Sequence, residues 1–371
     1  MTPLALRLPL RQFALPYWKK TDRRKRARWA TLLGLAAVLG AHGWLAAMVE
    51  TRRPEWRDPE FYHRQKRAAA LVHWQKSRGE SRPLVVILGG SRPQMGLSPE
   101  ALNRVLGDGP TDPIAYNCAQ SGCLPVGERL NLGRLFDAGL APDYLLVEVL
   151  PPVLADPGPV DDRIPPVRLG YADLRRLQPY QASPERVRME WARARLASWY
   201  SLRLPLMANW GLADYFPPGR SSPHHLWANM TFHGWMPFSP REWPAEQRTA
   251  QLNVARGTYS WLLDDFRIQP VNDRLYRDLL EECRIRGVRV ALFTMPESPT
   301  FRSWYPAGVR QRVADYLRDL SRDFGVPVFD TSAWIDNELS FMDGHHLLGE
   351  AATAFSERFG KECVAPWLQR K

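Results

Sequence analysis

Ser91, Asp343 and His346 are the residues whose types and spacing fit nucleophilic catalysis. Ser91 follows two glycines in LGGSR, and Asp343 and His346 stand three residues apart in FMDGHHL. A serine hydroxyl is a weak nucleophile that needs a general base within hydrogen-bond reach, and histidine suits this task because its pKa lies near neutrality. A carboxylate next to the histidine fixes its tautomer. The trio predicts acyl transfer, with Ser91 as nucleophile, His346 as base and Asp343 as the orienting acid.

Further residues are candidates for binding the substrate. Acyl transfer develops a negative oxygen, and we expect the backbone N–H groups of Ser91 and Gly122 to stabilise it. Arg92 either meets an anionic substrate or is simply exposed. Glu297 either lines the pocket or caps a turn or helix. Asn117 precedes Gly122 in the same loop and suits support of the turn better than donation to the substrate.

The remaining histidines and cysteines suggest no metal site. His345, the neighbour of the expected base, is predicted to face solvent. Neither residue type shows a metal-binding spacing, so we expect no metal and no cofactor. Cys118 and Cys123 are close enough in sequence to form a disulfide in an oxidising compartment. The alternative is that they, Cys283 and Cys363 are four buried thiols.

The candidate residues follow segments that are predicted to be strands. Apolar, β-branched runs occupy 83–90, 113–117, 144–150, 288–295 and 326–330, and helices are predicted at 57–78, from Ser98 onward, at 125–139, 272–286, 307–323 and 348–360. Strands that alternate with helices predict an α/β fold with a doubly wound, five-stranded parallel sheet. Ligands bind beyond the carboxyl ends of such strands, which is where each candidate residue stands.

Residues 151–267 interrupt the alternation and are predicted to form a mostly helical insertion. The first 16 of them contain six prolines, and seven tryptophans lie between Trp191 and Trp261. Within the insertion, 183–204 is predicted as one helix with Ser183 as its N-cap. The tryptophans are best explained as the core of a helical subdomain. A lid, a sugar-stacking surface and a membrane-resting face are the alternatives.

The N-terminal region predicts a membrane anchor. Residues 1–28 hold nine Lys/Arg and one acid, which accounts for most of the net charge of +11 and argues against nucleic acid as a partner. Residues 29–49 contain no charged side chain and would span roughly 30 Å as a helix. The cationic flank predicts a cytoplasmic tail at 1–28 and an outer domain after a juxtamembrane helix within 50–80. A cleaved signal peptide is the alternative.

Three sequence blocks resemble those of the SGNH/GDSL hydrolase superfamily. Gly89-Gly90-Ser91 is similar to the first block, Gly122 to the glycine of the second, and Asp343-x-x-His346-Leu347 to the fifth. Within the superfamily, the chain looks like the membrane-anchored bacterial branch of DltD-like and alginate O-acetylation proteins. The likeness covers 81–150 and 268–371, and it implies a flavodoxin-like SGNH domain.

The resemblance also implies a function and exposes one departure. It implies an extracytoplasmic (periplasmic or cell-surface) esterase or O-acyltransferase for acyl esters of a surface or exported polysaccharide, with envelope-assembly proteins as partners. The third block of the family supplies an asparagine to the oxyanion, whereas this chain has EVLPPV there. Arg92 or a residue of the insertion would have to substitute for it, or the substrate class differs. The alternative is a non-catalytic, anchored glycan-binding or assembly protein.

Overall fold

A five-stranded, all-parallel open sheet forms the centre of the molecule. The computed structural model describes residues 23–80, 82–122, 125–210, 212, 229–238 and 244–370. The strands are β1 (Leu84–Leu88), β2 (Ile114–Asn117), β3 (Tyr144–Glu148), β4 (Arg289–Thr294) and β5 (Val328–Asp330), in the order β2-β1-β3-β4-β5. Every neighbouring pair is parallel. The predicted α/β fold with five parallel strands is therefore confirmed, and each strand lies within its predicted range.

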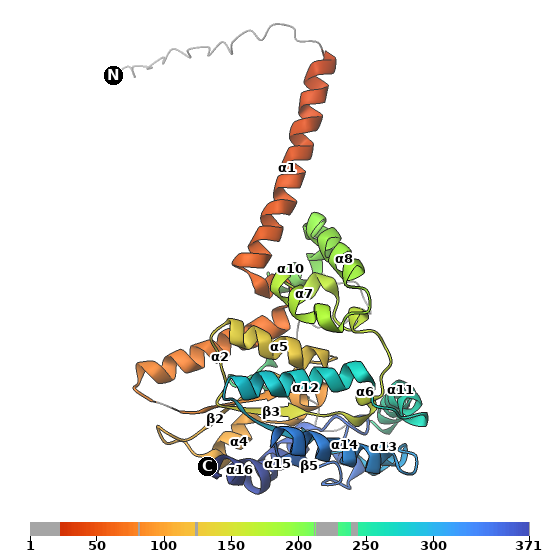
Figure 1. Cartoon of the computed structure of the whole chain (residues 1–371). Coiled ribbons are helices and arrows are strands. Elements are labelled where there is room, and N and C mark those ends of the chain that lie inside the picture. The colour runs from red at the N-terminus through yellow and green to blue at the C-terminus, as the bar shows by residue number, and fades with distance from the viewer. Residues whose placement is uncertain are drawn as a thin grey trace, which may run out of the picture.

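The sheet is covered by helices on both faces, which explains why its strands are continuous apolar runs. Alternate residues of β1 enter two separate cores: Leu84, Val86 and Leu88 one of them, Val85 and Ile87 the other. The first core is closed by α2 (Pro59–Ser77), α5 (Val126–Asp137), α12 (Pro270–Ile285) and α14 (Val309–Phe324), and the second by α4 (Pro99–Leu106), α15 (Gly349–Phe359) and α16 (Ala365–Gln369). Figure 1 shows α5 and α12 on one side of the sheet and α4 and α15 on the other.

The chain order of the strands determines where a ligand site can form. From β1 the chain continues outward to β2 and then returns to place β3 on the other side of β1. In open α/β sheets the crevice at such a reversal, beyond the carboxyl ends of the strands, is the usual ligand site. Ser91 follows β1 directly and begins α3 (Ser91–Gly96), a short helix that the sequence does not predict.

The insertion packs on the outer faces of α5 and α12. It contains α6 (Pro151–Leu154), α7 (Tyr171–Leu177), α8 (Pro184–Leu196), α9 (Ser198–Ser201), α10 (Arg203–Asn209) and α11 (Ala245–Asp264), with short 3-10 turns between α6 and α8. Its apolar cluster consists mainly of aliphatic side chains that contact Val126, Leu130 and Leu275. Trp199, Trp210 and Trp261 are exposed. The prediction that tryptophans fill a subdomain core is wrong for these three; Trp227 and Trp243 lie outside the described residues.

The single helix predicted at 183–204 is broken. Ala197 has φ −110° and ψ 43°, outside the helical region, and separates α8 from α9. Ser183 makes no capping hydrogen bond with its side chain; instead, its N–H donates to the carboxylate of Asp161 at 2.8 Å. After the break, Ser198 Oγ lies 3.2 Å from the carbonyl oxygen of His42. Contact with the N-terminal helix therefore overrides local helix propensity.

The N-terminal helix α1 (Arg23–Thr51) contains the predicted apolar segment and projects from the body of the protein (Figure 1). Among the described residues, it is the helix long and apolar enough to cross a membrane. The helix that follows, α2, matches the predicted juxtamembrane helix in position. However, Phe61 and Leu71 of α2 are buried in the main core, so this helix is part of the α/β body and not a spacer.

Candidate active site

Ser91, His346 and Asp343 form one hydrogen-bonded chain. Ser91 Oγ lies 2.6 Å from His346 Nε2, and His346 Nδ1 lies 2.7 Å from Asp343 Oδ2. Ser91 and His346 are partly exposed, whereas Asp343 is buried. The side chains of the candidate nucleophile and base are therefore accessible, and the candidate orienting acid is shielded from water.

The charge of Asp343 fixes the tautomer of His346. Burial alone would raise the pKa of Asp343, but the adjacent His346 and His345 outweigh it and hold this pKa well below its usual range. An ionised carboxylate can only accept, so His346 Nδ1–H donates to Asp343. In the neutral ring Nε2 then carries the lone pair and accepts the hydrogen bond from the Ser91 hydroxyl. This is the arrangement that a general base needs before it removes a proton from serine.

The loop that carries Asp343 and His346 is held rigidly. Its two ends form a bridge between Phe341 and Leu347, and Met342 N–H donates to the His346 carbonyl at 2.9 Å. Gly344 has φ +90°, and a Cβ there would lie 3.0 Å from a neighbouring leucine carbon. A glycine is therefore required at this turn. Asp343 Oδ1 adds a hydrogen bond from the His346 N–H at 2.9 Å, which locks the carboxylate in place.

The turn before Ser91 is held by a carboxylate from β3, which lies beside β1 in the sheet. A Cβ on Gly89 would lie 2.8 Å from Glu148 Cβ, so this position has no room for a side chain. Gly90 N–H donates to Glu148 Oε2 at 2.9 Å. Glu148 belongs to β3 and is fully buried. Sequence reasoning missed this residue, although an acid within the apolar run YLLVEVL is the signal that could have identified it.

Arg92 and Glu297 form a buried network beneath the site. Arg92 is neither exposed nor free: its Nε lies 3.3 Å from Glu148 and its Nη1 3.6 Å from Glu297, and it donates to the Met295 carbonyl. Tyr305 donates to Glu297 at 2.7 Å. Burial raises the pKa of Glu148 and of Glu297, and Arg92 opposes both shifts. The network supports the nucleophile turn from below. Neither alternative predicted for Glu297, pocket lining at Ser91 or capping, describes its position.

The prediction that His345 faces solvent is wrong. His345 is 3% exposed, and its Nδ1 lies 3.1 Å from Asp343 Oδ1. Its ring contacts the rings of Tyr259 and Phe301, with centroids 5.1 and 5.3 Å away. Burial, followed by the charge of His346, lowers the pKa of His345 to about 4. The residue therefore stays neutral at physiological pH and packs behind the triad.

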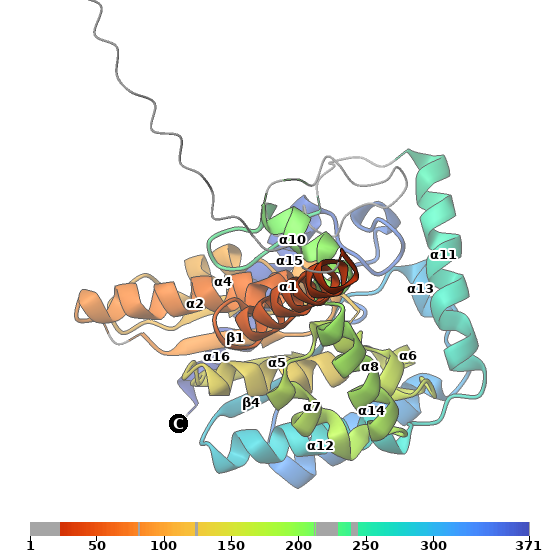
Figure 2. The ribbon, with the colours of Figure 1, turned by 90° about the horizontal axis from the view of Figure 1, so that it is seen from above.

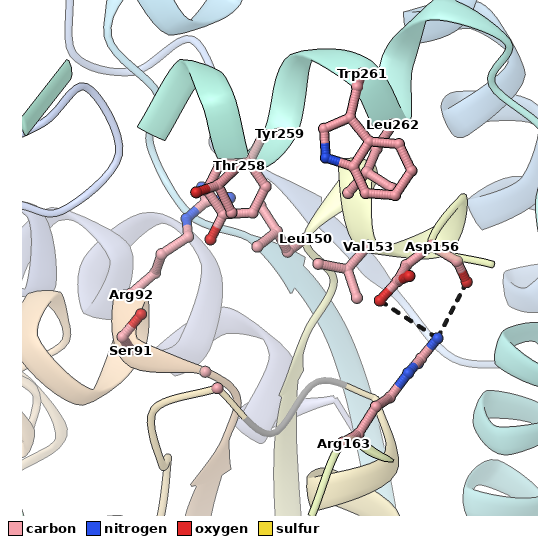
Figure 3. A pocket seen from close by; sticks show the side chains of 12 residues that line it. Ser91, Arg92, Leu150, Val153, Asp156, Arg163, Thr258, Tyr259, Trp261 and Leu262 are labelled. Carbon is pink, nitrogen blue, oxygen red and sulfur yellow. Dashed lines mark hydrogen bonds and ion pairs between the residues drawn. The ribbon is translucent and has the colours of Figure 1, made fainter. Parts of the chain in front are cut away.

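A pocket with a volume of about 290 Å³ opens at Ser91 (Figure 3). Its lining consists of the nucleophile turn, apolar residues that follow β3, and residues of the insertion: Gly90, Ser91, Arg92, Gly122, Leu150, Val153, Asp156, Arg163, Thr258, Tyr259, Trp261 and Leu262. Figure 3 shows the residues of α11 over the pocket and Arg163 across it from Ser91, where Arg163 lies 3.4 Å from Asp156. The sequence gives no signal for the contribution of α11, because it arrives from about 170 residues downstream.

The two residues predicted in the second loop have different roles. Gly122 lines the pocket and has φ +70°, a conformation that favours glycine. Asn117 is fully buried, and its amide donates to the Pro93 and Leu97 carbonyls at 2.8 and 2.9 Å. Its side-chain oxygen accepts from Ala119 N–H. Asn117 therefore has no group left for a substrate and supports the turn.

Leu150 follows β3 where the SGNH resemblance would place an asparagine donor, and it lines the pocket with an apolar side chain. Among the described insertion residues, Thr258 already donates to the Val254 carbonyl at 2.9 Å. Tyr259 also lines the pocket, and its hydroxyl makes no hydrogen bond to any described residue, which leaves it available as a donor. Burial raises the pKa of Tyr259 to about 12, so this hydroxyl keeps its proton.

A metal fits the site less well than a catalytic triad does. The described residues contain one group of three potential metal ligands, Asp343, His345 and His346, whose ligand atoms lie within 4.8 Å of one another. His346 already uses both ring nitrogens in hydrogen bonds, so the set fits a triad better than a metal site. Cys118 and Cys283 are buried, whereas Cys363 is partly exposed, so not all four cysteines are buried thiols. The predicted disulfide between Cys118 and Cys123 stays a prediction, because Cys123 lies outside the described residues.

Neither a family model nor a curated protein sequence matches this chain. The chemistry of the site therefore has to be inferred from its geometry.

Proposed function

We propose that this protein is an SGNH-type serine esterase or O-acyltransferase that acts on acyl esters. The observation that carries the proposal is the chain from Ser91 through His346 to Asp343, with atoms 2.6 and 2.7 Å apart at the mouth of a pocket. The nucleophile follows β1, whereas the base and the orienting acid share one rigid loop near the other end of the chain. Such an alignment is what activates a serine hydroxyl.

The reaction proceeds in two steps. Ser91 Oγ attacks the acyl carbonyl as its proton moves to His346 Nε2, and Asp343 stabilises the imidazolium. The N–H groups of Ser91 and Gly122 and the Tyr259 hydroxyl stabilise the oxyanion. The leaving alcohol then takes the proton from His346 and departs, which leaves an acyl-serine. Water or a sugar hydroxyl attacks this ester and gives its proton to His346; Ser91 recovers the proton as the acyl bond breaks.

The size and location of the site narrow the substrate. A pocket of about 290 Å³ is at the small end for ligand sites, which favours a short acyl ester on a larger carrier. Five basic residues lie at the start of α1, directly before its apolar part: Arg23, Arg24, Lys25, Arg26 and Arg28. This order favours a cytoplasmic N-terminus and an outer catalytic body. Acyl esters on a surface or exported polysaccharide fit both conditions.

A fluorophosphonate probe, which reacts with activated serines, tests the proposal on the full-length protein. We expect wild type to be labelled at Ser91 and Ser91→Ala to remain unlabelled. Asp343→Asn should be labelled about 10⁴-fold more slowly, because an amide orients His346 in the wrong tautomer. Ser77→Ala, which removes an exposed serine at the end of α2, should react like wild type.

Equal labelling of wild type and Ser91→Ala would refute the role of Ser91 as nucleophile.

The apolar Leu150 at the expected donor position favours one alternative, a non-catalytic glycan-binding or assembly protein on an SGNH-like fold. That alternative predicts the same host phenotype for wild type, Ser91→Ala and His346→Ala.

A further inference from the structure

The last three turns of α1 are packed against the insertion. Leu45 and Val49 are fully buried against Leu202 and Leu206. Trp199 Nε1–H donates to the Ala41 carbonyl at 3.2 Å. Both views of the molecule show α8 and α10 beside α1, with α8 rising along it beyond the rest of the body (Figures 1 and 2). The insertion therefore reaches well up the helix.

This contact lies at the depth of the bilayer when α1 crosses it. The uncharged part of α1 runs from residue 29 to residue 49, and Ala41 precedes its end by eight residues. At 1.5 Å per residue, Ala41 lies roughly 12 Å inside the outer end of the apolar segment. A segment that contacts Ala41 from the side cannot lie in water while residues 29–49 fill the hydrocarbon layer.

Three large apolar or aromatic side chains are exposed near that depth. Leu196 is 71% exposed and Tyr200 68%, and Trp199 between them is also exposed. These residues flank the break at Ala197, so the break presents them beside α1. Exposed apolar residues that cluster in this way mark a surface that contacts another apolar phase.

Aromatic and basic residues mark the edge of this surface. Trp210 lies 6.4 Å from Trp56 and 6.3 Å from Trp199, ring centroid to centroid, so a row of three indoles leads from Trp199, at the level of Ala41, to Trp56, which follows α1. Tryptophans gather at membrane–water interfaces in this way. On α8, Arg193 is exposed and makes no ion pair with any described residue. Its long side chain can reach anionic headgroups from a helix that lies in the interface.

We propose that α8, α9 and α10 are seated in the outer leaflet of the bilayer that α1 crosses, with Leu196, Trp199 and Tyr200 among the acyl chains. This proposal rests on the membrane-spanning role of α1 in the proposed function. It is independent of the catalytic triad. Two parts of the insertion then have different roles: α8, α9 and α10 bind the membrane, and α11 covers the pocket at Ser91.

Site-specific photocrosslinking to lipid tests the proposal on the full-length protein in vesicles of phosphatidylcholine and phosphatidylglycerol. Benzoylphenylalanine replaces Tyr200, Leu35 or Leu339, which are 68%, 55% and 63% exposed and tolerate the added ring. Leu35 reports the anchor. Leu339 is the matched control: it lies in the segment just before α15, and Figure 1 shows α15 on the side of the sheet away from α1.

We expect lipid adducts when the crosslinker replaces Leu35 or Tyr200, and no lipid adduct when it replaces Leu339. Adducts at Leu35 without any at Tyr200 would overturn the proposal and leave the anchor in place. The absence of adducts at both positions would refute the anchor as well. Crosslinking of Tyr200 to a polypeptide in place of lipid would identify a protein partner and also overturn the proposal.

Discussion

His345 lies between the triad and the aromatic side chains behind it. Because it is buried as a neutral ring, it lowers the stability of the folded protein at acidic pH. In the folded protein its pKa is about 4, against an ordinary value of 6.5. The unfolded chain therefore takes up a proton below pH 6.5 that the folded protein binds only near pH 4. The stability contributed by His345 is complete above this window and is lost as the pH falls through it.

His345→Asn should isolate this effect, because asparagine does not titrate. Between pH 7 and pH 4 the stability of wild type relative to the variant should fall by up to about 3 kcal/mol, at about 1.4 kcal/mol per pKa unit. Thermal unfolding midpoints of both proteins at the two pH values measure the change. The comparison cancels the acids that the two proteins share. A constant difference between the midpoints would contradict the burial of a neutral His345.

At the scale of single residues, the sequence predicted which side chains meet at the site better than it predicted the burial of their neighbours. The types and order of Ser91, Asp343 and His346 point to one reaction, and the structure brings the three side chains within hydrogen-bond distance. The burial of Arg92 and His345 could not be predicted in this way. It depends on glutamates and aromatic rings that lie far away in the sequence and meet these residues only in the fold.

Strand β3 and helix α5 contribute two buried acids with opposite expected effects on stability. Glu148 accepts from Gly90 and faces Arg92. Glu128 of α5 is also buried, and burial, followed by the charge of Glu148, raises its pKa well above the ordinary value. Glu128 therefore stays protonated in the folded protein at a pH where the unfolded chain would be ionised. This difference costs stability, and the cost grows as the pH rises above about 4.5.

Glu128→Gln should stabilise the protein, and more so at pH 6 than at pH 5, because the neutral amide removes a cost that grows by about 1.4 kcal/mol per pH unit above the unfolded-state pKa until the folded-state pKa is reached. Glu148→Gln, with the same change in shape, should destabilise it by leaving Arg92 partly unpaired. Thermal midpoints of the two variants and wild type at both pH values provide the check. An effect of Glu128→Gln that does not grow between pH 5 and pH 6 would contradict a raised pKa for Glu128.

Helix α11 supplies the hydroxyl that we expect to replace the missing asparagine. Tyr259→Phe keeps the ring against His345 and removes only the donor. Loss of one oxyanion donor should lower kcat on a chromogenic ester by about 10²-fold with little change in KM. Thr249→Ala, on an exposed part of the same helix, is the matched control. Full activity of Tyr259→Phe would assign the oxyanion to the backbone alone.

Regular elements were predictable where burial itself produces the pattern. Parallel strands covered on both faces must be apolar throughout, so all five were visible in the sequence. The helices α3 and α9 were not visible. Ser91 begins α3 because the chain must turn sharply against Glu148, and α9 separates from α8 because Ser198 and Trp199 contact α1. Both depend on contacts between distant segments, which no local pattern contains.

At the scale of the whole molecule, Glu50 ties the last turn of α1 to the insertion. Its carboxylate lies 2.6 Å from Arg195 and 3.7 Å from Arg57, and it accepts from Tyr171 N–H at 3.2 Å. Glu50→Ala should leave two largely buried guanidinium groups without this partner. The end of α1 and helix α8 should then open more often, while the triad stays intact.

Hydrogen exchange on the full-length protein in lipid nanodiscs measures this opening. We expect faster exchange in α8 and at residues 45–51 in Glu50→Ala, with an unchanged rate of fluorophosphonate labelling. Glu190→Ala removes a more exposed acid of α8 and should exchange like wild type. Equal protection in Glu50→Ala and wild type would show that the apolar contacts of Leu45 and Val49 hold the junction without it.

Under the proposed function, the packing of α1 against the insertion would make bilayer thickness a variable of the reaction. Transmembrane helices tilt when their apolar length exceeds the hydrocarbon thickness. A flexible tether would absorb such a tilt, but a helix buried at Leu45 and Val49 transmits it to the whole body. The mouth at Ser91 would then swing toward or away from the lipid surface as the membrane thins or thickens. Lipid composition could in this way set which part of a carrier chain reaches the serine.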